Sequence, residues 1–161
     1  MIHLILGQFG YMLSFGFASW GDHLRERYPV TTWPTPQAVA EIVTAIEAQP
    51  RLEKTAIVGF SLGSNAAAWI AAATSHPIDL IVAFDPTRQG ASLSDYALGK
   101  HVRRAICFKG VGYWPSSWFA GGGQLVGPQV EVIPTSTDHL MMQFDNRLRT
   151  LAEEALSETL L

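Results

Sequence analysis

The chain has 161 residues, 48% of them hydrophobic and 16% charged, which predicts one folded domain over residues 1–161 and excludes a largely disordered chain. The formal net charge of −3, with Lys and Arg scattered along the chain, gives no electrostatic reason to expect a nucleic-acid partner. The single cysteine, Cys107, excludes an intramolecular disulfide and fits a reducing compartment, so we expect a cytoplasmic protein.

Apolar runs and helical repeats alternate along the chain. The first 18 residues are apolar but lack the positively charged start of a secretory signal, and no stretch is long and apolar enough to be a clear membrane span. In chain order the sequence predicts strand 2–6, helix 15–28, strand 30–33, helix 37–48, strand 55–60, helix 65–74, strand 80–84, a short helix near 94–98, strand 105–108, strand 130–133 ended by Pro134, and helix 139–160.

This alternation determines the expected fold class. Most of the strands are apolar on both faces, which is typical of a parallel sheet covered by helices on each side. We therefore expect an α/β fold, a three-layer sandwich with a mostly parallel sheet of about six strands. In such sheets ligands bind beyond the carboxyl ends of the strands, and the polar residues considered below all follow a strand.

The pentapeptide Gly59-Phe60-Ser61-Leu62-Gly63 joins the third strand to an alanine-rich helix. A tight strand-to-helix turn exposes a serine oxygen and directs helix N–H groups at a reacting carbonyl, and it needs small residues two positions before and after the serine. Because Gly59 and Gly63 supply these small residues, the sequence predicts Ser61 as a catalytic nucleophile.

A serine nucleophile needs a base, and histidine is the usual one. Of the five histidines, His139 follows the last strand and enters the final helix, on the sheet edge where Ser61 is expected. His3 falls inside the first strand and is expected to be buried. We therefore predict His139 as the general base.

The third member of such a site is a carboxylate that orients the imidazole. Asp85, at the end of the fourth strand, gives the chain order Ser61, Asp85, His139. Asp138 is a rival, but neighbouring loop residues tend to point apart, and Asp138 suits a helix cap better. Asp95 is a weaker rival.

With these motifs the sequence resembles the α/β-hydrolase superfamily over nearly its whole length. The resemblance includes the segment Leu4-Ile5-Leu6-Gly7-Gln8-Phe9-Gly10, which looks like the family's strand and oxyanion loop. The chain departs from the family in being short, without the family's first two strands or an inserted cap domain, so we expect a minimal α/β-hydrolase fold. The resemblance implies that the oxyanion donors are the backbone N–H of Leu62 and that of Gln8 or Phe9.

The position of the acid departs from many members of the superfamily. These carry it one strand later, where this chain has Phe108-Lys109-Gly110-Val111-Gly112-Tyr113, without a carboxylate. Some lipase-like members place it one strand earlier, and Asp85 matches that variant.

An aromatic and glycine-rich segment lies between the fifth and sixth strands, and residues 110–127 show no periodicity. A flap or acyl-binding wall beside the site would have this composition, because aromatic rings cover apolar groups and glycines allow movement. The predicted substrate-binding residues are Tyr113, Trp114, Trp118 and Phe119.

These features predict a serine hydrolase that cleaves a small-molecule ester or thioester with an apolar acyl group. A catalytically inactive binding or assembly module with the same fold is the alternative, and it predicts a distance between Ser61 and His139 too long for a hydrogen bond. A peptidase or amidase would share the triad. No His-Glu-x-x-His pattern, cysteine cluster or phosphate-binding loop occurs, so we expect no metal and no cofactor. The sequence does not indicate whether the protein is a monomer or an oligomer.

Overall fold

The computed structural model describes residues 1–88, 95–110 and 122–161. The strands in these residues are β1 (Ile2–Ile5), β2 (Val30–Trp33), β3 (Ala56–Phe60), β4 (Ile78–Phe84), β5 (Asp95–Ala97), β6 (Val102–Gly110), β7 (Gln124–Val126) and β8 (Val130–Thr135). The α-helices are α1 (Phe15–Leu24), α2 (Val39–Glu47), α3 (Leu62–Ala73) and α4 (Asn146–Leu160), and the 3-10 helices are η1 (Gly10–Met12) and η2 (Met141–Phe144).

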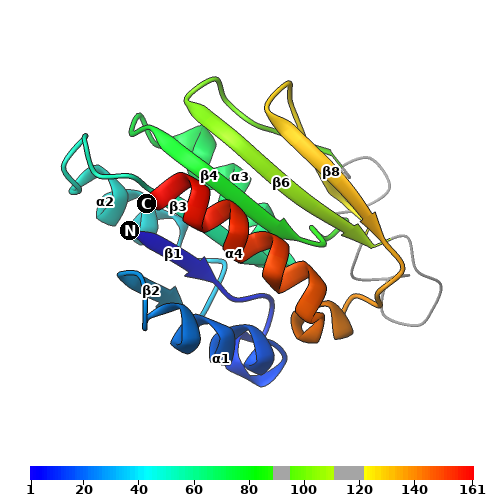
Figure 1. Ribbon diagram of the computed structural model, residues 1–161. Coiled ribbons are helices and arrows are strands. Elements are labelled where there is room, and N and C mark those ends of the chain that lie inside the picture. Colours follow the sequence, from blue (N-terminus) through cyan, green and yellow to red (C-terminus); the bar gives the residue numbers. More distant parts are fainter. Residues whose placement is uncertain (89–94, 111–121) are drawn as a thin grey trace.

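Six strands form one sheet in the order β2-β1-β3-β4-β6-β8, and every neighbouring pair is parallel. Helix α4 crosses one face of this sheet, with α1 beside it on the same side, and α3 lies behind (Figure 1). The predicted three-layer α/β sandwich is therefore confirmed, and the sheet is wholly rather than mostly parallel.

The two faces of the sheet bury different kinds of side chain. Under α1 and α4 the core is aromatic: Phe60, Phe84 and Phe108 occupy matching positions of neighbouring strands, and Phe17 and Trp20 of α1 pack on them. Under α2 and α3 the core is aliphatic, and buried alanines on α3 let that helix lie close to the sheet.

Two expectations about strands are wrong. Residues 95–97 of the expected short helix 94–98 form strand β5, which pairs in parallel with β7 inside the segment that showed no periodicity. Strand β8 also does not end before Pro134 but includes it, paired with Lys109. Proline is tolerated there because β8 is an edge strand, where one side needs no donor.

Three helices are shorter than expected, among them α2, which covers Val39–Glu47 rather than residues 37–48. Helix α1 ends at Leu24 rather than Tyr28, since the residue before Pro29 is disfavoured in the helical conformation. The final helix begins at Asn146, because Asp145 adopts an extended backbone that separates α4 from η2. Among the described residues no helix is long and apolar enough to cross a membrane.

Candidate active site

The register of the sheet brings the predicted site residues to one edge. Phe60 pairs with Phe84, so Ser61 and Asp85 directly follow the same level of the neighbouring strands β3 and β4. His139 lies four residues beyond the end of β8 and returns over this edge. All three residues therefore come from the carboxyl ends of strands, where parallel sheets place their ligands.

Ser61 occupies a strained turn between β3 and α3. Its backbone has φ 57° and ψ −124°, a conformation that costs a non-glycine residue roughly 1–3 kcal/mol. Both flanking glycines are required sterically: a Cβ on Gly59 would lie 2.5 Å from the Gly63 carbonyl oxygen, and one on Gly63 would lie 2.3 Å from that of Ile5. The buried Ser64 hydroxyl braces the turn, at 2.8 Å from the Gly59 carbonyl oxygen.

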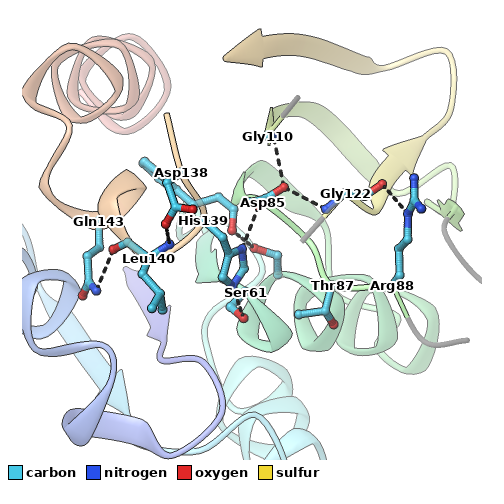
Figure 2. Close-up of polar contacts among 12 residues, drawn as sticks. Ser61, Asp85, Thr87, Arg88, Gly110, Gly122, Asp138, His139, Leu140 and Gln143 are labelled. Atoms are coloured by element: carbon cyan, nitrogen blue, oxygen red, sulfur yellow. Dashed lines mark hydrogen bonds and ion pairs between the residues drawn. The ribbon is translucent and has the colours of Figure 1, made fainter. Parts of the chain in front are cut away.

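His139 bridges the serine and the acid. Its Nε2 lies 2.9 Å from Ser61 Oγ and its Nδ1 lies 2.7 Å from Asp85 Oδ2 (Figure 2). With Nδ1–H donating to the carboxylate, Nε2 carries the lone pair and accepts from the serine hydroxyl. The imidazole is 2% exposed and stacks on Phe60 at a centroid distance of 5.3 Å, so its orientation is fixed on three sides.

Asp85 is fully buried and its carboxylate has its own set of donors. Besides His139, the backbone N–H groups of Gly110 and Gly122 donate to Oδ1 at 3.0 and 3.1 Å (Figure 2). A buried carboxylate that accepts three hydrogen bonds is compensated for its loss of water. Gly110 belongs to the segment 108–113, where the sequence offered no carboxylate, and a Cβ on Gly110 would lie 2.9 Å from Asp85 Oδ2.

The structure does not bring the rival carboxylates to the imidazole. Asp138 Oδ1 accepts a hydrogen bond from the backbone N–H of Leu140 at 3.0 Å (Figure 2), but the helix cap expected of Asp138 is wrong, because the N-cap of η2 is Leu140 and that of α4 is Asp145. Asp95 begins β5 with an exposed side chain. Of the three candidate acids, Asp85 makes the contact with His139.

The predicted oxyanion donors lie around Ser61. Leu62 is the first residue of α3, so its N–H has no acceptor within the helix. Loop 7–10 approaches from the other side, where a Cβ on Gly7 would lie 3.0 Å from Ser61 Cβ. Among the described residues neither Gln8 N nor Phe9 N has a protein acceptor, and either can serve as the second donor.

Unusual backbone conformations coincide with the predicted site. In the part of the chain that the structure describes, the non-glycine residues with positive φ are Phe9 at 64°, Ser61 at 57° and Asp85 at 45°. Each is a residue that the sequence assigned to the oxyanion loop, the nucleophile or the acid. Strain of this kind persists where the surroundings fix it, and it concentrates at functional sites.

Sequence reasoning missed several residues that support these groups. Phe60 stacks on His139, although the sequence predicts only that it belongs to the third strand and the pentapeptide. Gly110 and Gly122 were not assigned as donors, because backbone N–H groups carry no signal in the residue type. The sequence offers one indication, which is that Gly110 lies in the segment 108–113, where the carboxylate expected in many members of the superfamily is absent.

The predicted substrate-binding residues Tyr113, Trp114, Trp118 and Phe119 lie outside the described residues. Other apolar side chains are exposed on two segments adjoining the site. Phe15 and Phe144 bring the segments together at a centroid distance of 5.2 Å, and the buried Gln143 bonds the Leu13 carbonyl and the Gly16 N–H. The exposed side chains are those of Phe9, Tyr11, Met12, Leu13, Phe15, Leu140, Met141 and Phe144.

The remaining groups that could support chemistry are the Cys107 thiol and possible metal ligands. Burial raises the pKa of Cys107 to about 11, so this thiol stays protonated and is a poor nucleophile at neutral pH. Within residues 1–88, 95–110 and 122–161, no group of three or more His, Cys, Asp or Glu side chains could hold a metal ion.

No family model and no curated protein matches the sequence. Solved structures do match. A predicted CIB-like hydrolase from Thermoplasma acidophilum aligns with a TM-score of 0.56 and 14% identity, over 95% of this chain and 84% of that chain. The NocB thioesterase domain, in covalent complex with a fluorophosphonate nocardicin G analog, aligns with a TM-score of 0.60 and 12% identity, over 99% and 94% of the two chains.

The chain has the α/β-hydrolase fold. The resemblance drawn from the sequence is thus confirmed at the level of the fold. Within this α/β-hydrolase fold, Ser61, Asp85 and His139 follow strands β3, β4 and β8.

Proposed function

We propose that the protein is a serine hydrolase that cleaves an ester or thioester with an apolar acyl group. The observation that carries this proposal is the continuous hydrogen-bonded chain from Ser61 Oγ through His139 to the buried carboxylate of Asp85. A serine hydroxyl becomes a useful nucleophile only beside a correctly oriented base, and here the base is itself oriented by a third group.

In the proposed first half-reaction, Ser61 Oγ attacks the substrate carbonyl while His139 Nε2 takes its proton. Asp85 stabilises the imidazolium that forms. The N–H of Leu62 and that of Gln8 or Phe9 bind the developing oxyanion, and each such donor is typically worth roughly 2.7–4 kcal/mol of barrier. His139 then donates its proton to the leaving alcohol or thiol, which departs and leaves an acyl group on Ser61.

In the second half-reaction water replaces the leaving group. His139 Nε2 takes a proton from the water, whose oxygen attacks the acyl carbonyl, and the same donors stabilise the second oxyanion. Transfer of the proton to Ser61 Oγ releases the carboxylic acid and restores the free enzyme. These two half-reactions need no metal or cofactor.

The apolar acyl group is supported by the exposed side chains near the site. Phe9 belongs to the proposed oxyanion loop, and the rings of Phe15 and Phe144 contact each other in a tilted arrangement where the two segments meet. An acyl chain leaving water against these side chains would gain about 0.8 kcal/mol for each buried methylene. The thioesterase neighbour supports including thioesters among the candidate substrates.

A fluorophosphonate probe tests the nucleophile directly. We expect the wild-type protein to be labelled on Ser61, and Ser61→Ala to lose the label and reduce kcat on a p-nitrophenyl ester by up to about 10⁶-fold. Mass spectrometry of the labelled peptide identifies the site. The matched control, Ser157→Ala on helix α4, should retain both properties. Labelling that persists in Ser61→Ala would contradict the proposal.

Paired substrates then distinguish the reaction types. Turnover of a p-nitrophenyl ester, the corresponding S-acyl thioester and a p-nitroanilide with the same acyl group separates esterase, thioesterase and amidase activity. We expect the ester or the thioester to be hydrolysed faster than the anilide. An inactive binding module would turn over none of them, but the 2.9 Å separation of Ser61 and His139 does not support that alternative.

A further inference from the structure

Helix α3 carries a buried amide side chain one turn after the nucleophile. Asn65 is fully buried and its side chain bonds the loop that follows Asp85. Its Nδ2 lies 3.1 Å from the Thr87 carbonyl oxygen, 2.9 Å from Thr87 Oγ1 and 2.6 Å from Tyr96 Oη, and its Oδ1 accepts from Thr87 N–H at 2.9 Å.

This arrangement fixes the backbone of the acid loop. Asn65 bonds both the N–H and the C=O of Thr87, as a neighbouring strand would, and the Tyr96 hydroxyl also donates to the Thr87 carbonyl at 2.9 Å. In Figure 2 Thr87 lies beside helix α3, in the loop that continues from Asp85. A fully buried amide without these partners would be costly, so the side chain and the loop depend on each other.

Asp85 has a strained backbone, and these hydrogen bonds can help to maintain it. Asp85 adopts φ 45°, a conformation that a non-glycine residue keeps only when its surroundings enforce it. On the strand side, Asp85 N–H donates to the Phe108 carbonyl at 2.8 Å. On the loop side, the Asn65 bonds to Thr87 begin two residues further along.

We propose that Asn65 is a positioning residue that holds Asp85 in hydrogen-bond contact with His139. Helix α3 then sets both ends of the triad: its N-terminus presents Ser61, and its next turn anchors the acid loop through Asn65. Tyr96 of β5 completes the anchor. This role rests on the proposed function, but it has a structural signature that can be measured without turnover.

The first readout is the ¹H NMR resonance of the His139 Nδ1 proton, which a short bond to a carboxylate shifts to low field. His139→Gln identifies the resonance by removing it. We expect Asn65→Leu, similar in size but without hydrogen bonds, to lose or broaden this resonance. The control Thr55→Val removes a buried side-chain bond, to Gln49 at 2.7 Å, at the other end of β3 and should keep it.

The second readout is kinetic. A displaced acid misorients the base without removing substrate contacts, so we expect Asn65→Leu to lower kcat by about 10²-fold with KM changed less than about 2-fold. In an Asp85→Asn background the same substitution should have no further effect on kcat, because the group that Asn65 positions is already lost. Tyr96→Phe should give a smaller loss of the same kind, and it remains informative if Asn65→Leu does not fold.

The outcomes separate this inference from the proposed function. A wild-type protein that hydrolyses esters, with an unchanged resonance and kcat in Asn65→Leu and Tyr96→Phe, overturns the positioning role alone. So does an equal loss of kcat in the wild-type and Asp85→Asn backgrounds. A wild-type protein without the low-field resonance contradicts the His139–Asp85 bond itself, and with it both the positioning role and the proposed function. A protein without hydrolase activity whose resonance still depends on Asn65 supports the positioning role and contradicts the proposed function.

Discussion

At the scale of single residues, the absence of a side chain matters as much as its presence. Gly110 ends β6, within the segment 108–113 that follows the strand after the one ending at Asp85 and that has no carboxylate. Here the space above that strand end is filled by Asp85 from the neighbouring strand, and the Gly110 N–H donates to it. The earlier acid position and the glycine are therefore two parts of one arrangement.

This arrangement predicts the effect of adding one methyl group. In Gly110→Ala the new Cβ would lie 2.9 Å from Asp85 Oδ2 and displace the carboxylate from His139. We expect kcat for ester hydrolysis to fall by about 10- to 100-fold while KM stays nearly constant. Gly99→Ala, at the opposite end of β6 and near the His101 ring, is the matched control and should keep the wild-type kcat. An unchanged kcat in Gly110→Ala would show that the carboxylate position tolerates this contact.

At the scale of elements, the loop that carries His139 is held by the start of helix α4. Asp145 caps α4 by accepting from Arg147 N–H at 3.0 Å and Leu148 N–H at 3.3 Å. Its other oxygen accepts from the Thr137 hydroxyl at 2.6 Å, two residues before the histidine. One carboxylate thus starts the helix and secures the loop.

Removing the Asp145 side chain should destabilise the folded protein. We expect Asp145→Ala to lower the free energy of unfolding by roughly 0.5–2 kcal/mol, the usual range for an N-cap. Urea denaturation followed by circular dichroism measures the difference. Glu154→Ala, an exposed substitution in the middle of α4, serves as the control. Equal unfolding free energies for the two variants would contradict the capping role.

Sequence patterns predicted the elements with strong apolar periodicity and missed those defined by tertiary contacts. Ser61 could be identified because the glycines that its turn requires are visible in the sequence. Strands β5 and β7 could not, because each has three residues and exists through pairing with the other. The anchoring by Asn65 was also invisible, since a polar residue in an alanine-rich helix gives no indication of its partner.

At the scale of the whole molecule, a buried histidine lies away from the site on strand β1, next to the edge strand β2. His3 is 2% exposed, its Nδ1 accepts from Trp33 Nε1–H at 3.2 Å, and its Nε2 lies 2.6 Å from Gln49 Nε2. Burial lowers the pKa of His3 from 6.5 to about 4. The unfolded chain therefore binds a proton between these two pH values that the folded protein does not.

The sign of the resulting pH dependence follows from linkage. The stabilisation associated with neutral His3 is complete above pH 6.5 and is lost as the pH falls toward about 4. The difference of about 2.5 pKa units corresponds to a loss of about 3 kcal/mol. Urea denaturation at several pH values should show this loss in the wild type and a flatter dependence in His3→Gln. His23→Gln, at an exposed position, should behave as the wild type, and the same slope in His3→Gln would contradict the assignment.

The division of the core into two faces also affects how the chain can fold during synthesis. The aliphatic half under α2 and α3 is supplied mainly by residues that precede β8, whereas the aromatic half needs α4, whose Glu153 bonds Trp20 from 133 residues away at 2.7 Å. Before α4 has emerged from the ribosome, the part of this aromatic face that α4 covers is exposed to solvent. Such an apolar surface favours binding to chaperones and to other unfinished chains, so the risk of aggregation falls once α4 covers it.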